Sequence, residues 1–304
     1  MSTSTDTALS EGQLEFRRPS GARTVKNALA YGYVVLATVL AIIPLVWVLY
    51  TVISKGARLV FTSSWWLQSQ RGITPRREGG GAYHAIIGSI EIGLICAAIA
   101  VPIGVLGAIF LIEYARGTKV ARVVSFTVDI LSGIPSIVAA LFIYALLITI
   151  LGFGRSTIAV SCALVLLMLP VVLRSTEEML KLVPDHLREA SYALGVSKWK
   201  TILRIVIPTA FGGISTGVVL GLARVMGETA PLLILISYAV GINFSPTSGT
   251  MGALPTMINS GRDQAPTFPG YERVWAAALT LILIVMLLNL LARGIARASK
   301  LKEK

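Results

Sequence analysis

The sequence predicts an all-α integral membrane protein with six transmembrane helices. Hydrophobic residues make up 55% of the 304 residues and charged residues only 14%, a balance outside the usual range of soluble proteins. Six apolar stretches meet or approach the roughly 20 residues that a helix needs to cross the hydrocarbon layer. The basic residues behind the net charge of +12 fall between these stretches, where they can orient the chain in a bilayer, so nucleic acid is not a predicted partner.

The six predicted spans are separated by connections of very different length. They are residues 28–53, 83–112, 123–151, 156–173, 205–240 and 274–292. The fifth stretch is too long for one helix, so we expect a helix up to about Met226, a break at Gly227 and Pro231, and a shorter apolar return. Six crossings place both termini on one side of the membrane.

Basic residues predict the orientation, because they favour the cytoplasmic side. With the N-terminus inside, eighteen Lys and Arg residues lie in inner segments and eight in outer segments, so both termini are predicted to be cytoplasmic. The first outer loop departs from the rule with five basic residues between Lys55 and Arg77. It is either a solvated loop or a docking or anion-attracting surface.

Composition also suggests the domain organisation. We expect a disordered, Ser- and Thr-rich cytoplasmic tail at residues 1–25, a first transmembrane helix with its outer loop at 26–82, a core transmembrane domain at 83–296 and a cytoplasmic tail at 297–304. Cys96 and Cys162 have no His or acidic neighbour at ligand spacing, so neither a metal site nor a disulfide is predicted. No G-x-x-x-x-G-K-[ST] loop occurs, and no hydrolytic group of residues is visible, so the chain is predicted not to be an enzyme and to bind no cofactor itself.

The cytoplasmic loop at residues 174–208 contains a predicted short helix. Pro184 suits the first helical position, Asp185 and Glu189 favour the positive end of the helix dipole, and Gly195 can adopt the left-handed conformation that ends a helix. One face would form a small-residue ridge that fits a groove on a partner. The ridge consists of Leu187, Ala190, Ala193 and Leu194. The basic residues are expected to be solvated or to face lipid. They are Arg188, Lys198 and Lys200.

The same loop carries a sequence motif. Glu189-Ala190-Ser191, Gly195 and Ile205-Val206-Ile207-Pro208 resemble the motif of bacterial ABC importer membrane subunits, which reads Glu-Ala-Ala, three residues, Gly, nine residues, Ile, one residue, Leu-Pro. Ser191 and Ile207 are conservative departures. An ordinary interfacial helix is the alternative, although it would not require this spacing.

This resemblance implies a type I ABC importer permease in the bacterial inner membrane. The short helix would be a coupling helix that docks on a separate cytoplasmic ATPase, and that ATPase would use ATP and Mg. The implied coupling residues are Arg188, Glu189, Ala190, Ser191, Leu194 and Gly195.

Four ionisable residues lie within predicted spans, where each costs roughly 2.5 to 3.5 kcal/mol and so requires a partner or a function. They are Glu91, Asp129, Arg224 and Glu228. Arg224 and Glu228 would share a helix face if the helix continued that far, and an internal ion pair is then one interpretation. We favour the other, in which Arg224 grips an oxyanion along the transport pathway and Glu228 moderates that grip.

A second resemblance concerns the substrate. The Arg-x-x-Gly-Glu-Thr core at residues 224–231 and the Leu-Ser-Gly-Ile-Pro-Ser-Ile-Val stretch at 131–138 resemble signatures of the phosphate-specific (Pst) permeases. Physically, the second stretch interrupts the third span with Gly and Pro. It predicts either a cavity lined by Ser132, Ser136 and freed amides, or an ordinary proline kink.

The second resemblance implies inorganic phosphate as substrate. The implied partners are a second homologous permease, two copies of a cytoplasmic ATPase, an extracytoplasmic phosphate-binding protein and membrane lipid. A permease for another anion, such as sulfate or molybdate, would share the coupling loop. A secondary transporter or channel would leave the pattern from Glu189 to Pro208 unexplained.

Overall fold

The computed structural model describes residues 21–247 and 249–301, and these fall into two units with a boundary between Thr51 and Val52. Regular secondary structure in the described residues is helical, apart from an isolated β-bridge between Ser237 and Thr250. Residues 1–20 of the predicted N-terminal tail and 302–304 of the predicted C-terminal tail lie outside the described residues.

The described part of the first unit belongs to helix α1 (Gly21–Val60), which is apolar enough to span a membrane and already includes residues 21–25. The hydroxyl of Thr38 donates to the carbonyl oxygen of Val34, and that of Thr51 to Trp47, each at 2.8 Å. These polar groups are thereby satisfied within the helix, as a lipid environment requires.

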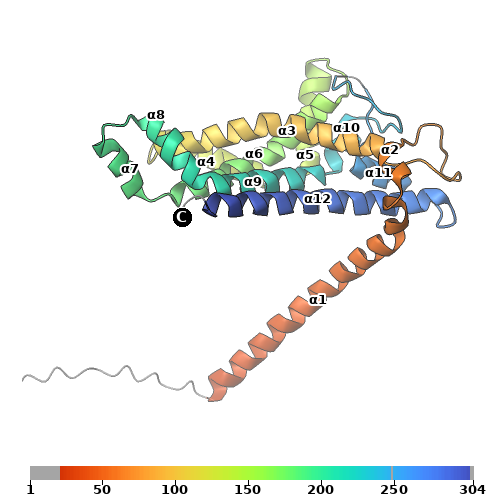
Figure 1. Ribbon diagram of the computed structural model, residues 1–304, viewed down its shortest axis with the longest axis horizontal. Helices are drawn as coiled ribbons and strands as arrows, with labels where there is room; N and C mark the ends of the chain where they lie inside the picture. The colour runs from red at the N-terminus through yellow and green to blue at the C-terminus, as the bar shows by residue number, and fades with distance from the viewer. Residues whose placement is uncertain (1–20, 248, 302–304) are drawn as a thin grey trace, which may run out of the picture. The chain divides into compact units, whose positions relative to one another are not determined.

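The second unit contains the end of α1 and the remaining helices. In chain order they are α2 (Ser63–Leu67), α3 (Tyr83–Ile109), the π-helix η1 (Phe110–Tyr114), α4 (Lys119–Ser132), α5 (Ser136–Ile143), the π-helix η2 (Tyr144–Ile150), α6 (Thr157–Lys181), α7 (Asp185–Ala193), α8 (Lys198–Thr201), the π-helix η3 (Ile202–Val206), α9 (Ile207–Met226), α10 (Ala230–Leu235), α11 (Leu254–Gly261) and α12 (Pro269–Leu301). In Figure 1, α3, α6, α9 and α12 run side by side, with α7 and α8 at one end and α2 and α11 at the other.

Five described helical segments are long and apolar enough to cross a membrane, and the count reaches six if one bent pair is a single broken span. That pair is 119–132 with 136–150, and its members are bent by 106°. Because residues 133–135 between them are not helical, the third predicted stretch is two helices, either a broken span or a re-entrant loop, and not one helix with an ordinary proline kink. The predicted break of the fifth stretch is confirmed: α9 ends at Met226 with Gly227 as its C-cap, and α10 starts at Ala230.

Helix α6 lies at the centre of the main hydrophobic core and packs against α3 and α9. Small residues allow these close approaches, as is typical of membrane helices. A Cβ added to Gly104 of α3 would lie 2.8 Å from Val172 Cγ1, and one added to Gly217 of α9 would overlap Ser175 Oγ. The sequence did not predict α11, which is tied to α3 by the Leu254 amide donating to Ser89 Oγ at 2.8 Å.

Candidate functional site

Helix α7 forms where the sequence predicts a short helix. Pro184 is its N-cap, with φ −64° and ψ 138°, so the helix begins at Asp185, one residue later than expected. Asp185 lies in the first turn, where its charge complements the helix dipole. Gly195 follows the C-cap with φ +74°, the left-handed conformation that only glycine adopts without strain.

The exposed face of α7 is not the same set of residues as the predicted ridge. Leu187 packs against a core cluster beneath the helix, so it does not belong to an exposed ridge. Ser191 is also buried, and its hydroxyl lies 2.8 Å from that of Thr201 at the end of α8. The exposed residues include Glu189, Ala190, Ala193 and Leu194, of which Leu194 is 83% exposed. Of the implied coupling residues, Glu189, Ala190, Leu194 and Gly195 remain available to a partner.

Arg188 is directed into the protein, contrary to the prediction that it is solvated. Its side chain is 12% exposed and forms a 2.9 Å ion pair with Glu113 of η1, whose side chain is 5% exposed. Lys198 of α8 donates to the main-chain oxygen of the same Glu113, and its ammonium lies 4.8 Å from the ring centre of Tyr114. Glu113 was not among the candidate residues predicted from the sequence, although an acid at the end of a long apolar run was a usable signal.

A second charged cluster lies on α6. Arg174 binds Asp129 of α4 at 2.5 Å and Glu177 at 2.6 Å, and Lys181 binds the other oxygen of Glu177 at 2.8 Å. Asp129, whose partner the sequence left open, therefore pairs with Arg174. The guanidinium also donates to the Ser125 carbonyl oxygen at 2.9 Å, so it holds α4 against α6 just before the break at residues 133–135.

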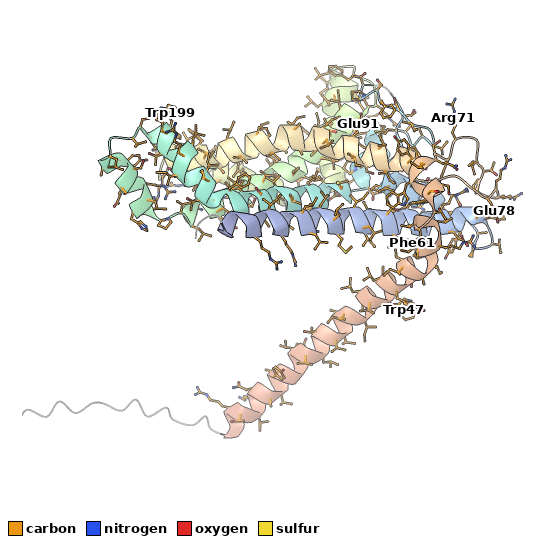
Figure 2. The ribbon with its side chains drawn as sticks, viewed as in Figure 1. Trp47, Phe61, Arg71, Glu78, Glu91 and Trp199 are labelled. Atoms are coloured by element: carbon orange, nitrogen blue, oxygen red, sulfur yellow. The ribbon has the colours of Figure 1, made fainter. Side chains whose placement is uncertain are left out.

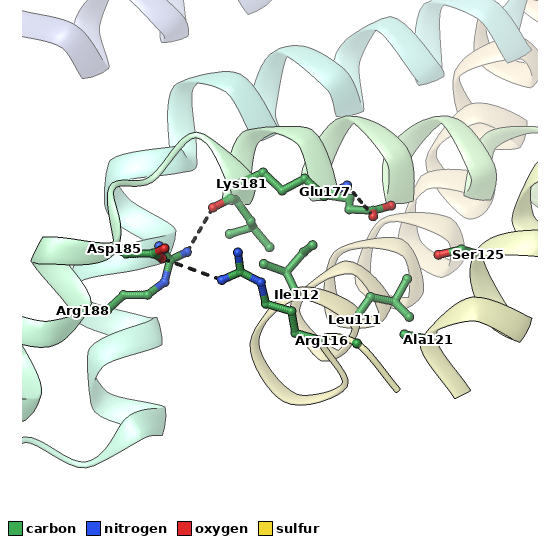
Figure 3. A pocket seen from close by; sticks show the side chains of 11 residues that line it. Leu111, Ile112, Arg116, Ala121, Ser125, Glu177, Lys181, Asp185 and Arg188 are labelled. Carbon is green, nitrogen blue, oxygen red and sulfur yellow. Dashed lines mark hydrogen bonds and ion pairs between the residues drawn. The ribbon is translucent and has the colours of Figure 1, made fainter. Parts of the chain in front are cut away.

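A cavity of about 300 Å³ is lined by residues of both clusters. Figure 3 shows Glu177 and Lys181 on one side of it, and Asp185 between Arg116 and Arg188 on the other. Arg116 and Asp185 are both largely exposed and lie 3.9 Å apart, so this pair is much looser than the pair between Arg188 and Glu113.

Arg224 and Glu228 are not joined. Helix α9 ends at Met226, so the condition for a shared helix face is not met, and no ion pair within residues 21–247 and 249–301 connects them. Arg224 is exposed, and its side chain forms no hydrogen bond or ion pair with a described residue. Glu228 is half-buried in the break before α10. Glu91, on α3, is also half-buried (Figure 2).

Ser132 and Ser136 flank the break in the third span. Ser132 is exposed, and its hydroxyl donates to the Asp129 carbonyl oxygen at 2.7 Å. The amides of Gly133 and Ile134 are bonded within the turn. Ser136 begins α5 after the N-cap Pro135, and the first amides of a helix have no partner within it.

Arg273 holds the long connection between α2 and α3, at the end of the unit opposite α7. Arg273 is 5% exposed, and its guanidinium donates to the carbonyl oxygens of Thr74, Arg77 and Gly79 at 2.8 to 3.1 Å. The basic side chains of this connection, among them Arg71 in Figure 2, remain exposed.

A polar pair of the buried His84 and the half-buried Tyr238 lies at the same end. His84 Nε2 lies 3.3 Å from the Tyr238 hydroxyl. A tyrosine hydroxyl is protonated at neutral pH, because its ordinary pKa is about 10. Tyr238 can therefore donate a hydrogen bond to His84.

The chain is similar to known membrane transport proteins. A family model described as binding-protein-dependent transport system inner membrane component matches residues 100–301. The phosphate transport system permease protein PstA 1 of Mycobacterium tuberculosis H37Rv is 51% identical over 91% of this chain and 89% of its own length. The PstA proteins of Mycobacterium leprae and Yersinia pestis are 52% and 37% identical over 88% and 93% of this chain, and over 88% and 94% of their own lengths.

Solved structures share the fold at low sequence identity. A bacterial ABC transporter involved in import of the acidic polysaccharide alginate aligns with TM-score 0.63 and 14% identity, over 91% of this chain and 98% of that one. An inward-facing MetNI methionine ABC transporter aligns with TM-score 0.53 and 22% identity, over 72% and 94%. At these identities the likeness concerns the fold alone.

Proposed function

The chain belongs to the binding-protein-dependent transport system inner membrane component family, and from this premise we propose that it is a permease subunit of an ATP-driven inorganic phosphate importer. The observation that carries the substrate is the 51% identity to a PstA phosphate permease over 91% of the chain. The fold agrees with this function, since the described residues include five helices long and apolar enough to cross a membrane, or six if the bent pair is one span, and the structural relatives belong to ABC importers.

ATP hydrolysis is assigned to another subunit. The sequence contains no phosphate-binding loop of the G-x-x-x-x-G-K-[ST] kind, which ATPases of this class use to hold nucleotide phosphates. Helix α7, with Glu189, Ala190 and Leu194 exposed, is the surface that we assign to docking on that ATPase. The distribution of basic residues supports a cytoplasmic position for α7 and for both termini.

The complete importer then contains this chain and four further subunits. These are a second, PstC-like permease that completes the pathway, two PstB-like ATPases and a PstS-like extracytoplasmic phosphate-binding protein. Closure of the ATPases moves α7 and switches the permease pair between outward-facing and inward-facing states. ATP drives this cycle only through its different affinity for the two states.

Arg224 is the residue that we assign to phosphate. It stands exposed at the end of α9, where no described side chain neutralises its charge. An unneutralised guanidinium at membrane depth suits bidentate contact with an oxyanion. Glu228, Ser132 and Ser136 are assigned to the same pathway, with Glu228 accepting a hydrogen bond from a protonated phosphate oxygen.

Anion uptake into vesicles tests the function. The complete complex of five subunits is reconstituted in proteoliposomes with ATP inside. Uptake of labelled phosphate is then measured in the presence of excess unlabelled phosphate, sulfate or molybdate. We expect ATP-dependent uptake that unlabelled phosphate suppresses and the other anions do not. If sulfate or molybdate suppressed uptake as strongly as the same excess of unlabelled phosphate, phosphate would not be the specific substrate. Uptake that continues without ATP would indicate a secondary transporter.

A further inference from the structure

Arg188 makes as many hydrogen bonds as a guanidinium has N–H groups, which is five. Nε and one Nη donate to Glu113 Oε1 at 3.1 and 2.9 Å. The same Nη reaches the Leu180 carbonyl oxygen at 3.0 Å. The other Nη donates to the Val183 carbonyl oxygen at 2.6 Å and to Asp185 Oδ1 at 3.1 Å. Arg188 therefore has no N–H group left for an ATPase or a substrate.

These bonds connect separate helices. Glu113 belongs to η1, the continuation of α3, while Leu180 and Val183 lie at the end of α6 and just beyond it. Lys198 adds a bond from α8 to the Glu113 main-chain oxygen. These bonds fasten the segment carrying α7 and α8 to the ends of two membrane-spanning helices. The three residues that make them are here named the clamp: Glu113, Arg188 and Lys198.

Burial makes the clamp stiffer than other charge pairs at this end. The side chains of Glu113 and Arg188 are 5% and 12% exposed, so little water competes for their hydrogen bonds. The pair between Arg116 and Asp185 is 78% and 62% exposed with 3.9 Å between its atoms. The exposed pair is separated at little cost, whereas separating Arg188 from Glu113 would leave the buried Glu113 carboxylate without a basic partner and Arg188 with only the exposed Asp185.

The clamp also acts where the helices are π-helical. Glu113 lies in η1, and α8 runs directly into a second π-helix, η3, which leads to α9. The hydroxyl contact between Ser191 and Thr201 fixes α7 to this second junction. Such π-helical turns are frequent at functional sites in helices. Helix α7 is thereby joined to α3, α6 and α9, three of the helices that lie side by side in Figure 1.

We propose that Glu113, Arg188 and Lys198 are positioning residues that make movement of α7 and movement of the membrane helices a single event. This inference rests on the proposed function, because α7 moves only if an ATPase docks on it. Two elements move together only when breaking the link between them requires more free energy than moving the second element with the first. Without the clamp, α7 would follow the ATPase while α3 and α6 stayed behind, and ATP would be hydrolysed without import.

The test measures the ratio of anion imported to ATP hydrolysed, in proteoliposomes that contain the complete complex. For Glu113→Gln and Arg188→Lys we expect that ratio to fall roughly fivefold or more, while the ATPase still copurifies with the permease as in the wild type. Lys198→Ala, at an exposed position with one bond to lose, should lower the ratio by a smaller factor. The matched controls Glu178→Gln and Lys200→Ala change exposed charges nearby and should leave the ratio unchanged.

Three results would overturn the clamp. The first is a wild-type ratio in both Glu113→Gln and Arg188→Lys. The second is loss of ATPase copurification in Arg188→Lys, which would make Arg188 a docking contact. The third is used if those two variants do not assemble. In that case a wild-type ratio of anion imported to ATP hydrolysed in Lys198→Ala would contradict the clamp. If the wild-type complex imports sulfate or molybdate in place of phosphate, the proposed substrate is wrong, while the ratio for that anion still tests the clamp.

Discussion

The charged residues around α7 and those at the break after α9 are used in opposite ways. At α7, Arg188 and Glu113 are buried and bonded to each other, and Arg188 has no free donor. After α9, Arg224 is exposed and has no recorded partner among the described residues. The sequence predicted both arginines to be functional.

This difference separates two kinds of function. A charge that is satisfied inside the chain can position other elements, but it cannot also bind a ligand without losing its partner. A charge left unsatisfied at membrane depth has to find its partner outside the chain, in another subunit or in the substrate. The α7 end is therefore assigned to force transmission, and the α9 end to recognition.

The largest expected effect is on stability at the α7 end. Glu113→Ala removes the buried carboxylate partner of Arg188 and leaves its guanidinium with only the exposed Asp185, and breaking a buried pair in this way should cost about 3 to 5 kcal/mol. Thermal unfolding of the detergent-purified permease would show this as a large fall in Tm. A variant with an unchanged Tm would mean that Arg188 finds another partner, and the contrast between the two regions would disappear.

Arg224→Ala should give the next largest effect, on transport and not on stability. Hydrogen bonds to charged groups contribute about 1.5 to 3 kcal/mol, so import should slow by about tenfold to a hundredfold. The Tm should stay at its wild-type value, because no described partner is lost. Arg297→Ala, near the end of α12, is the control and should import normally. Normal import by Arg224→Ala would remove Arg224 from the pathway.

Gly195→Ala tests the backbone at the end of α7. The substitution meets no neighbouring atom, but the φ of +74° is unfavourable for alanine, so we expect a loss of about 1 kcal/mol. Gly294→Ala, in an open position within α12, should be neutral or slightly stabilising. The pair is compared by thermal unfolding, and equal shifts would contradict the role of the left-handed conformation.

Asp129→Asn should have the smallest effect. Its side chain is 65% exposed, and Arg174 keeps Glu177 at 2.6 Å, so the loss should be below about 1 kcal/mol. Glu177→Gln removes a nearly buried carboxylate that has two basic partners and should lower the Tm further. If Asp129→Asn were the more damaging variant, exposure would not be the property that distinguishes these charges.

Several site residues were identifiable from sequence because their signals are local. The break at Gly227 and the short helix ending at Gly195 follow from residues within one or two helical turns of each other. The ion pair between Arg224 and Glu228, the interpretation that the sequence favoured less, is absent from the described part of the chain for a local reason as well, since α9 ends two residues after Arg224. The roles of Glu113 and Arg273 were not identified from the sequence, because their hydrogen-bond partners are distant along the chain.

The sequence by itself determined the fold class, the order of the spans, the breaks within two of them and the position of α7. It could do so because apolar length, glycine, proline and capping residues act on neighbouring residues. Only the tertiary structure decided which charges are satisfied: Arg188 meets Glu113 from 75 residues away, and Arg273 meets carbonyls 194 to 199 residues away. Such partners are chosen by how the helices pack, and the geometry of that packing depends on the whole chain.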